Sequence, residues 1–97
     1  MKREIAYQHD LKMILQDRFQ GCMVIRTDPT HLQGIPDLLI LYKNHWAALE
    51  VKRTLDSSHQ PNQDYYVKKM NEMSFASFIC PENQEEVLND LERAFNA

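Results

Sequence analysis

The chain has 97 residues, of which 43% are hydrophobic and 26% charged, values typical of globular domains rather than disordered segments. This length suits one modest core, so we expect a single domain over residues 1–97. The formal net charge of −3 argues against a simple polybasic nucleic-acid binder. The longest apolar run, residues 38–42, is too short for a membrane span, and the N-terminus lacks the apolar stretch of a signal peptide, so we expect a soluble, cytoplasmic protein.

Acidic residues gather toward the C-terminal end of the chain. Residues 82–97 contain five acidic side chains against one basic side chain, so residues 1–81 carry a net charge of about +1. If the acidic segment faces away from a ligand, the rest of the chain could meet a polyanion, above all with a bound divalent cation. The same segment leaves open a small interaction protein whose last helix binds a basic partner.

Hydrophobic periodicity and turn residues divide the chain into seven predicted elements. They are a helix over 3–19, strands over 22–26, 37–42 and 46–52, a helix from Pro61 to about Met73, a strand over 75–80 and a last helix after Asn83. Pro61 suits the first turn of its helix, and Asn83 is expected to cap the last helix with Glu86 in a capping box. The order α-β-β-β-α-β-α predicts an α/β fold, a mixed four-stranded sheet flanked by helices.

The second and third predicted strands form a hairpin that brings two acids together. If its turn is centred between Lys43 and Asn44, Asp37 faces Glu50 across the antiparallel pair, with Cβ atoms about 5 Å apart. A three-residue turn would shift this register by one residue. Two carboxylates at that distance repel each other, and a hard divalent cation between them would reverse the sign of the interaction.

Lys52 extends this candidate site. It lies two residues beyond Glu50, so both side chains leave the same face of the strand. A lysine beside a metal-bound water and a phosphate can orient the nucleophile or take its proton. The backbone carbonyl of Val51 is a further candidate metal ligand. The alternative is a surface cluster of charges at a sheet edge.

At these residues the sequence resembles a known family. Gly34-Ile-Pro-Asp37, then twelve residues, then Glu50-Val-Lys52 resembles the signature of the PD-(D/E)XK nucleases. The form Gly-x-Pro-Asp-Leu with Glu-Val-Lys and a downstream glutamine, here Gln63, is similar to the VRR-NUC domains of that superfamily, in their stand-alone phage or bacterial type. Glu4 matches a glutamate on the family's first helix. The resemblance covers most of the chain and implies a restriction-endonuclease-like αβββαβα core.

The resemblance also implies an activity, Mg²⁺- or Mn²⁺-dependent endonucleolytic hydrolysis of phosphodiester bonds in DNA. In that reading Asp37 and Glu50 hold the cation, and Glu4 is an outer metal or water ligand. Lys52 handles the water or the scissile phosphate, and Gln63 supports Lys52. Basic side chains that lie near the site in the sequence are candidate contacts to the DNA backbone: Arg53, Lys68, Lys69 and His31.

Stand-alone proteins that resemble this chain in length are regarded as dimeric Holliday junction resolvases, so a homodimer acting on branched DNA is the leading expectation. A C₂ pair supplies two copies of one active site, which suits symmetric cuts in two strands. Trp46, Tyr65 and Phe75 are available for the interface. We expect no membrane partner and no organic cofactor.

Two further functions stay open beside the interaction protein. One is a flap or single-strand nuclease, which needs only one site and hence one copy. The other is a catalytically inactive nucleic-acid-binding module of the same fold. The intact set Asp37, Glu50 and Lys52 favours the active nuclease, because degenerate members of such folds usually lose one of the three.

Overall fold

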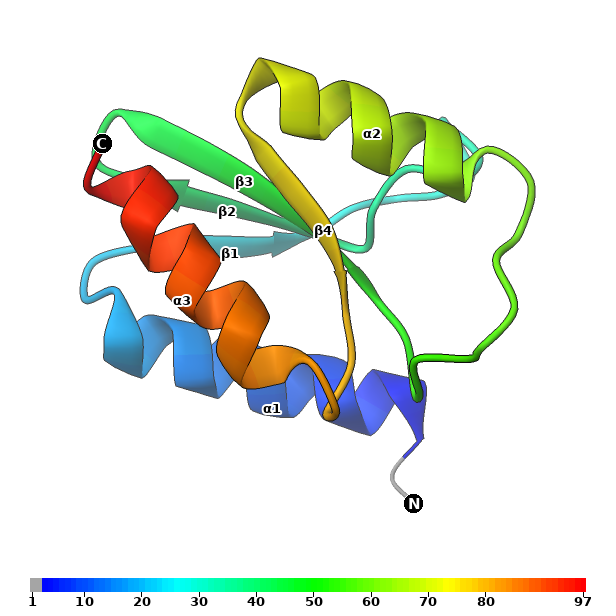
Figure 1. The fold of residues 1–97 in the computed structure, drawn as a ribbon, viewed down its shortest axis with the longest axis horizontal. Helices are drawn as coiled ribbons and strands as arrows, with labels where there is room; N and C mark the ends of the chain where they lie inside the picture. Colours follow the sequence, from blue (N-terminus) through cyan, green and yellow to red (C-terminus); the bar gives the residue numbers. More distant parts are fainter. Residues whose placement is uncertain (1–2) are drawn as a thin grey trace.

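The computed structural model describes residues 3–97 and confirms the predicted α/β fold (Figure 1). Its elements are α1 (Glu4–Arg18), β1 (Met23–Arg26), β2 (Leu38–Tyr42), β3 (His45–Val51), α2 (Gln63–Met73), β4 (Phe75–Ile79) and α3 (Gln84–Phe95). Their order is the expected one. No helix within this range is long and apolar enough to cross a bilayer.

The four strands form one mixed sheet in the order β1-β2-β3-β4. The first three strands are antiparallel to their neighbours, whereas β3 and β4 are parallel, as expected for two strands connected through a helix. Tyr42 pairs with His45, so the hairpin has the two-residue turn assumed above. Lys43 in that turn has a φ of 56°, the left-handed conformation that tight hairpin turns require.

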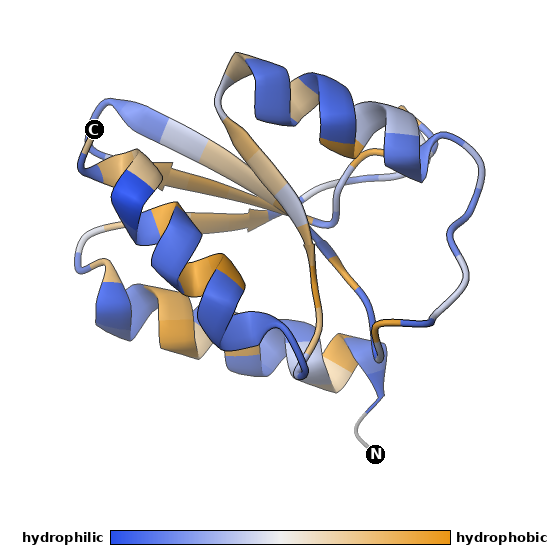
Figure 2. Cartoon of the chain, viewed as in Figure 1, coloured by the Kyte–Doolittle hydropathy of each residue, from blue (hydrophilic) through white to orange (hydrophobic). Residues whose placement is uncertain are grey.

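Helices cover both faces of the sheet. The larger core lies between the sheet and the pair α1 and α3, and its strand residues alternate along β3 as Ala47, Leu49 and Val51. The smaller core lies under α2, where Val67 packs with Ala48 of β3 and Ala76 of β4. Figure 2 shows the strands coloured as mainly hydrophobic, with polar residues on the outer sides of the helices. Because Ala48 of β3 packs under α2, the other even-numbered residues at the end of β3 also face α2.

The apolar stripes that predicted the first and last helices are confirmed. Tyr7, Leu11 and Leu15 of α1 are buried, as are Leu88 and Leu91 of α3. The two helices are also joined by a hydrogen bond of 2.7 Å from the Tyr7 hydroxyl to Oε1 of Gln84. This contact fixes the N-terminal half of α1 against α3.

Two local predictions are wrong. Asn83 precedes α3 but makes no side-chain capping bond; its Oδ1 instead accepts a hydrogen bond of 2.8 Å from the backbone N–H of Cys80. The expected capping box with Glu86 therefore does not form. Pro61 lies outside α2, because Asn62 adopts a left-handed conformation with a φ of 75° and turns the chain before Gln63.

Candidate active site

Asp37 and Glu50 meet where β2 begins and β3 ends. The ladder pairs Leu38 with Leu49, so the register is the predicted one and the two acids are the next pair along. Oδ2 of Asp37 accepts a hydrogen bond of 2.9 Å from the backbone N–H of Val51. This bond holds the Asp37 carboxyl against the end of β3, beside Glu50.

Glu50 is a buried carboxyl group with an unsatisfied oxygen. The residue is 1% exposed, and no hydrogen-bond donor among the described residues reaches its Oε1. The pKa of Glu50 is raised from 4.5 to about 8, first by burial and then by the negative charge of Asp37 and proton sharing with that carboxyl; Lys52 opposes these effects. Ionising Glu50 without a compensating cation is therefore costly.

Lys52 supplies a buried positive charge next to Glu50. It is 7% exposed, and its Nζ lies 3.9 Å from Oε2 of Glu50. The ammonium group donates hydrogen bonds of 2.7 Å to Oε1 of Gln63 and 3.1 Å to the backbone carbonyl of Ser58. Lysines are rarely this buried unless they are paired, because the charged group loses its hydration.

Gln63 connects the acid to the lysine. Its Nε2 donates a hydrogen bond of 3.0 Å to Oε2 of Glu50, while its Oε1 accepts from Lys52. The same Oε1 also accepts a hydrogen bond of 2.8 Å from the backbone N–H of Gln60. Both ends of the amide are thus occupied, and the first residue of α2 sets the relative positions of Glu50 and Lys52. Gln63 thus contacts Lys52 in the structure, and its support of Lys52 in catalysis stays a prediction.

Gly34 explains how α2 comes so close to the hairpin. Its φ is +92°, and a Cβ at this position would lie 2.6 Å from Cβ of Asn62 and 3.0 Å from the carbonyl oxygen of Pro61. Only glycine combines this conformation with this approach of another segment. The glycine of the Gly-Ile-Pro-Asp motif therefore allows the start of α2, and with it Gln63, to dock beside Asp37.

Glu4, the first residue of α1, lies within electrostatic range of the same site. Burial raises the pKa of Glu4, and the charge of Asp37 raises it further, whereas Lys52 and Arg53 lower it. Its side chain is partly buried, in agreement with its expected position on the inner stripe of α1. A helix and two strands distant in sequence thus contribute acids to one end of the sheet.

The carboxylate pair suits a magnesium-like cation. Across residues 3–97, no three His, Cys, Asp or Glu side chains gather closely enough to hold a metal ion by themselves. Mg²⁺ commonly binds one or two carboxylates and completes its shell with waters and substrate phosphates. Asp37 and the unsatisfied Oε1 of Glu50 provide such hard oxygen donors. The donor set therefore fits Mg²⁺ or Mn²⁺.

The side chains that the sequence predicts as contacts to the DNA backbone lie outside this cluster. Arg53 is exposed directly after Lys52 and acts electrostatically on Glu4. His31 is exposed and lies 3.6 Å from Asp28 within its own loop. Lys68 and Lys69 are exposed on α2, further along the helix than Gln63. No hydrogen bond or ion pair among the described residues joins these last three side chains to the central four: Asp37, Glu50, Lys52 and Gln63.

One participant was missed by the sequence analysis. The carbonyl of Ser58 holds the ammonium group of Lys52, and a backbone oxygen in a polar connector gives no sequence signal. His59, the next residue, stacks on Phe78 with ring centroids 4.1 Å apart and contacts Asp64 at 2.7 Å. These contacts anchor the connector, and hence the Ser58 carbonyl, beside β4 and α2.

No protein-family model, no curated protein and no solved structure matches the chain. The resemblance to PD-(D/E)XK nucleases therefore depends on the motif residues and on the site that they form.

Proposed function

We propose that the chain is a metal-dependent endonuclease that hydrolyses phosphodiester bonds in DNA, of the VRR-NUC type. The observation that carries the proposal is the cluster of Asp37, Glu50 and Lys52, in which a buried acid has an unsatisfied oxygen. When Glu50 is ionised, this oxygen has no donor among the described residues, which is destabilising unless a cation binds it. A hard divalent cation would satisfy this oxygen and relieve the repulsion between the two acids.

The residues have separable roles in this proposal. Asp37 and Glu50 would hold Mg²⁺ or Mn²⁺ together with the carbonyl of Val51, and Glu4 would contact a water of the outer shell. The bound cation would supply Lewis-acid activation of the phosphate and of the attacking water. Lys52, held by Gln63, would bind a nonbridging phosphate oxygen or take the proton of that water.

The burial of the charged residues favours catalysis over simple nucleic-acid binding. A binding module needs exposed basic side chains that reach phosphates, and its affinity gains nothing from a lysine that is 7% exposed. Burial instead strengthens electrostatic effects on a reacting phosphate. The inactive module and the interaction protein thus leave Lys52 and its two hydrogen bonds without a role.

We propose in addition that the enzyme is a homodimer that cuts branched DNA, with a four-way junction as the leading substrate. The sheet face opposite α1 and α3 is only half covered, because α2 packs on β3 and β4. On the uncovered half, Met23 and Ile25 of β1 are 58% and 38% exposed and pair with Leu41 and Leu39 of β2. β1 is also an edge strand, so a second copy could cover this apolar surface around a two-fold axis.

Of the aromatic residues named for the interface, Trp46 adjoins this surface. It pairs with Leu41 and packs partly against the α2 core. Tyr65 lies on α2 and is 57% exposed, whereas Phe75 packs against the main core. Light scattering should give twice the chain mass of 11.5 kDa, and Ile25→Lys should give the monomer mass. A monomeric wild-type chain, with and without junction DNA, would exclude the dimer.

The proposed activity is tested by incubating the purified chain with linear duplex, flap, single-stranded and four-way junction DNA, with Mg²⁺, Mn²⁺ or EDTA. We expect cleavage only with the cation, and faster cleavage of branched than of linear DNA. RNA of the same sequences serves as a parallel substrate. Absence of cation-dependent cleavage of every DNA substrate would exclude the nuclease. Cleavage of flaps alone would favour the single-site alternative.

A further inference from the structure

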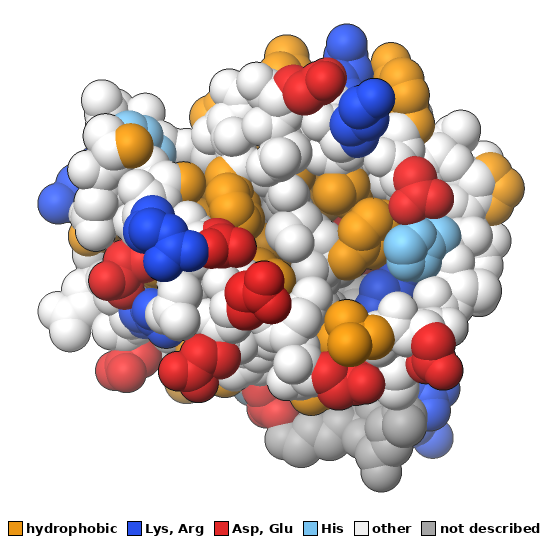
Figure 3. Space-filling view, in the orientation of Figure 1, with side chains coloured by type: hydrophobic (Ala, Val, Ile, Leu, Met, Phe, Trp, Pro, Cys, Tyr) orange, Lys and Arg blue, Asp and Glu red, His pale blue; other side chains and the backbone are white. Residues whose placement is uncertain are grey.

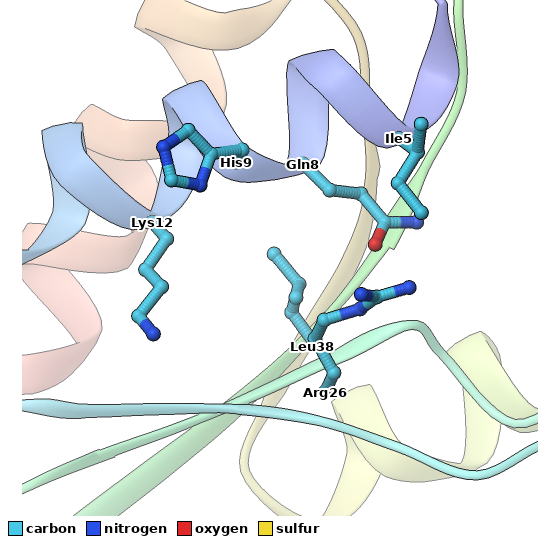
Figure 4. Close-up of a pocket in the computed structure, with 6 residues that line it drawn as sticks. All are labelled: Ile5, Gln8, His9, Lys12, Arg26 and Leu38. Atoms are coloured by element: carbon cyan, nitrogen blue, oxygen red, sulfur yellow. The ribbon is translucent and has the colours of Figure 1, made fainter.

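A hollow of about 320 Å³ lies between α1 and the start of the hairpin (Figure 4). It is lined by Ile5, Gln8, His9, Lys12, Arg26 and Leu38. Figure 4 shows Lys12 extending from α1 toward the strands and the guanidinium of Arg26 lying below the Gln8 amide in this view. We call this hollow the α1–β1 groove.

The α1–β1 groove lies at the same end of the sheet as the proposed active site, on the sheet face that α1 covers. Leu38 follows Asp37 directly, and Arg26 is its partner in the β1–β2 ladder. The backbone N–H of Thr27 donates a hydrogen bond of 2.9 Å to the Asp37 carbonyl, which ties the end of β1 to the site. On the other wall, Ile5 follows Glu4. Glu4 interacts electrostatically with Asp37, so the groove and the cation site meet at this end of the sheet.

The chemistry of the α1–β1 groove matches a sugar-phosphate backbone. Lys12 and Arg26 are exposed, and within residues 3–97 neither side chain has a hydrogen bond or ion pair. Gln8 adds an amide donor, and Ile5 and Leu38 add an apolar lining against which a sugar could pack. From Glu4 to Lys12, α1 rises about 12 Å, which leaves room for more than one phosphate.

The acidic surface of α3 argues against an approach of a polyanion from that side of the molecule. α3 carries Glu85, Glu86, Asp90 and Glu92 against Arg93, and Figure 3 shows acidic side chains spread over this side of the molecule. A nucleic-acid strand would be repelled there. The lining of the groove instead includes a basic side chain on each wall and no carboxylate.

We propose that the α1–β1 groove binds the phosphate backbone of the DNA strand that flanks the scissile bond, with Lys12 and Arg26 as the main phosphate contacts. This inference rests on the proposed nuclease function and adds the path of the strand away from the cation. It also differs from the sequence-based expectation, which placed contacts to the DNA backbone at Arg53, Lys68, Lys69 and His31.

The test measures affinity by fluorescence anisotropy with a labelled DNA duplex, an RNA duplex of the same sequence and a labelled four-way DNA junction. All measurements are made in Mg²⁺ and on a Lys52→Met background that prevents cleavage. The variant is Lys12→Gln with Arg26→Gln, which keeps the aliphatic stems. The matched control is Lys43→Gln with Arg93→Gln, which removes the same charge at exposed positions of the β2–β3 turn and of α3. A third protein carries Lys12→Arg with Arg26→Lys.

We expect the Lys12→Gln, Arg26→Gln variant to lose at least about tenfold in affinity, and the slope of log K against log salt to become shallower by about 2. The control and the charge-retaining exchange should stay within about twofold of the background. Equal affinity of variant and control would overturn the groove assignment. A preference for an RNA duplex over DNA would overturn the assignment of DNA as occupant.

This result is separable from that of the proposed function. If the wild-type chain cleaves DNA but the groove variant binds normally, only the groove inference fails. If the groove variant loses affinity and the wild-type chain does not cleave, the groove is supported and the nuclease activity is not. If the wild-type chain does not bind DNA, both fail.

Discussion

Replacing Glu50 by glutamine should stabilise the protein at high pH when no metal is bound. Between pH 4.5 and about 8 the unfolded chain releases the Glu50 proton, while the folded chain keeps it because its pKa is raised. The folded state then binds more protons, so its stability falls as pH rises through this window and stays low above it. Glutamine removes this effect, and its amide can donate to Asp37 while its oxygen accepts from Gln63.

The size of the effect follows from the pKa. One pKa unit corresponds to about 1.4 kcal/mol, so a rise from 4.5 to about 8 sets an upper limit of about 5 kcal/mol. Solvent screening and relaxation of the Asp37–Glu50 pair reduce this value, and we expect about 2 kcal/mol. That is a large fraction of the stability of a small domain.

Urea unfolding at pH 5 and pH 9, in EDTA, measures the prediction. Glu50→Gln should exceed the wild type by about 2 kcal/mol at pH 9 and by under about 1 kcal/mol at pH 5. Glu72→Gln, at an exposed position of α2, makes the same change in net charge and should show no such difference. Added Mg²⁺ should stabilise the wild type at pH 9 but not Glu50→Gln. A Glu50→Gln protein that is less stable than the wild type at pH 9 would refute the reasoning.

Three further predictions concern the residues that assemble the site. Gly34→Ala should lower the free energy of unfolding by about 3 kcal/mol, since it adds a contact with Asn62 to the cost of a positive φ. Gly21→Ala has a similar φ and open space, so it should cost only about 1 kcal/mol in the same urea titration; equal losses would contradict the close approach. Gln63→Leu should slow DNA cleavage about 10- to 100-fold with little change in Mg²⁺ affinity by calorimetry, and an unchanged rate would remove its positioning role. Lys52→Met should slow cleavage about 1,000-fold while circular dichroism shows an intact fold, and wild-type-like cutting would exclude Lys52 from catalysis.

The central residues of the site could be predicted from the sequence because they depend on one hairpin. A two-residue turn after Tyr42 fixes the register, and the register alone places Asp37 opposite Glu50. The period of two then places Lys52 on the same strand face as Glu50. These are local consequences of strand geometry, so a motif on a hairpin is enough to derive them.

Other features depend on how distant segments dock, and the sequence pattern does not contain that information. The contact of Gly34 with Asn62, and the carbonyl of Ser58 that holds Lys52, arise only when the connector folds back over the sheet. The failed capping box at Asn83 has a different, local origin. Its side chain fits the position before α3, but a backbone N–H at the end of β4 competes for it. Local propensity identified this residue and not its partner.

The most direct test of the nuclease proposal is the single-turnover rate of junction cleavage as a function of Mg²⁺ concentration. For the wild type we predict a rate that rises with Mg²⁺ to saturation and is abolished by EDTA. Glu72→Gln should match it, whereas Glu50→Gln should be slower by about 1,000-fold, since the cation contributes several kcal/mol of transition-state stabilisation. Cleavage that is independent of Mg²⁺, or a Glu50→Gln protein that cuts at the wild-type rate, would contradict the account.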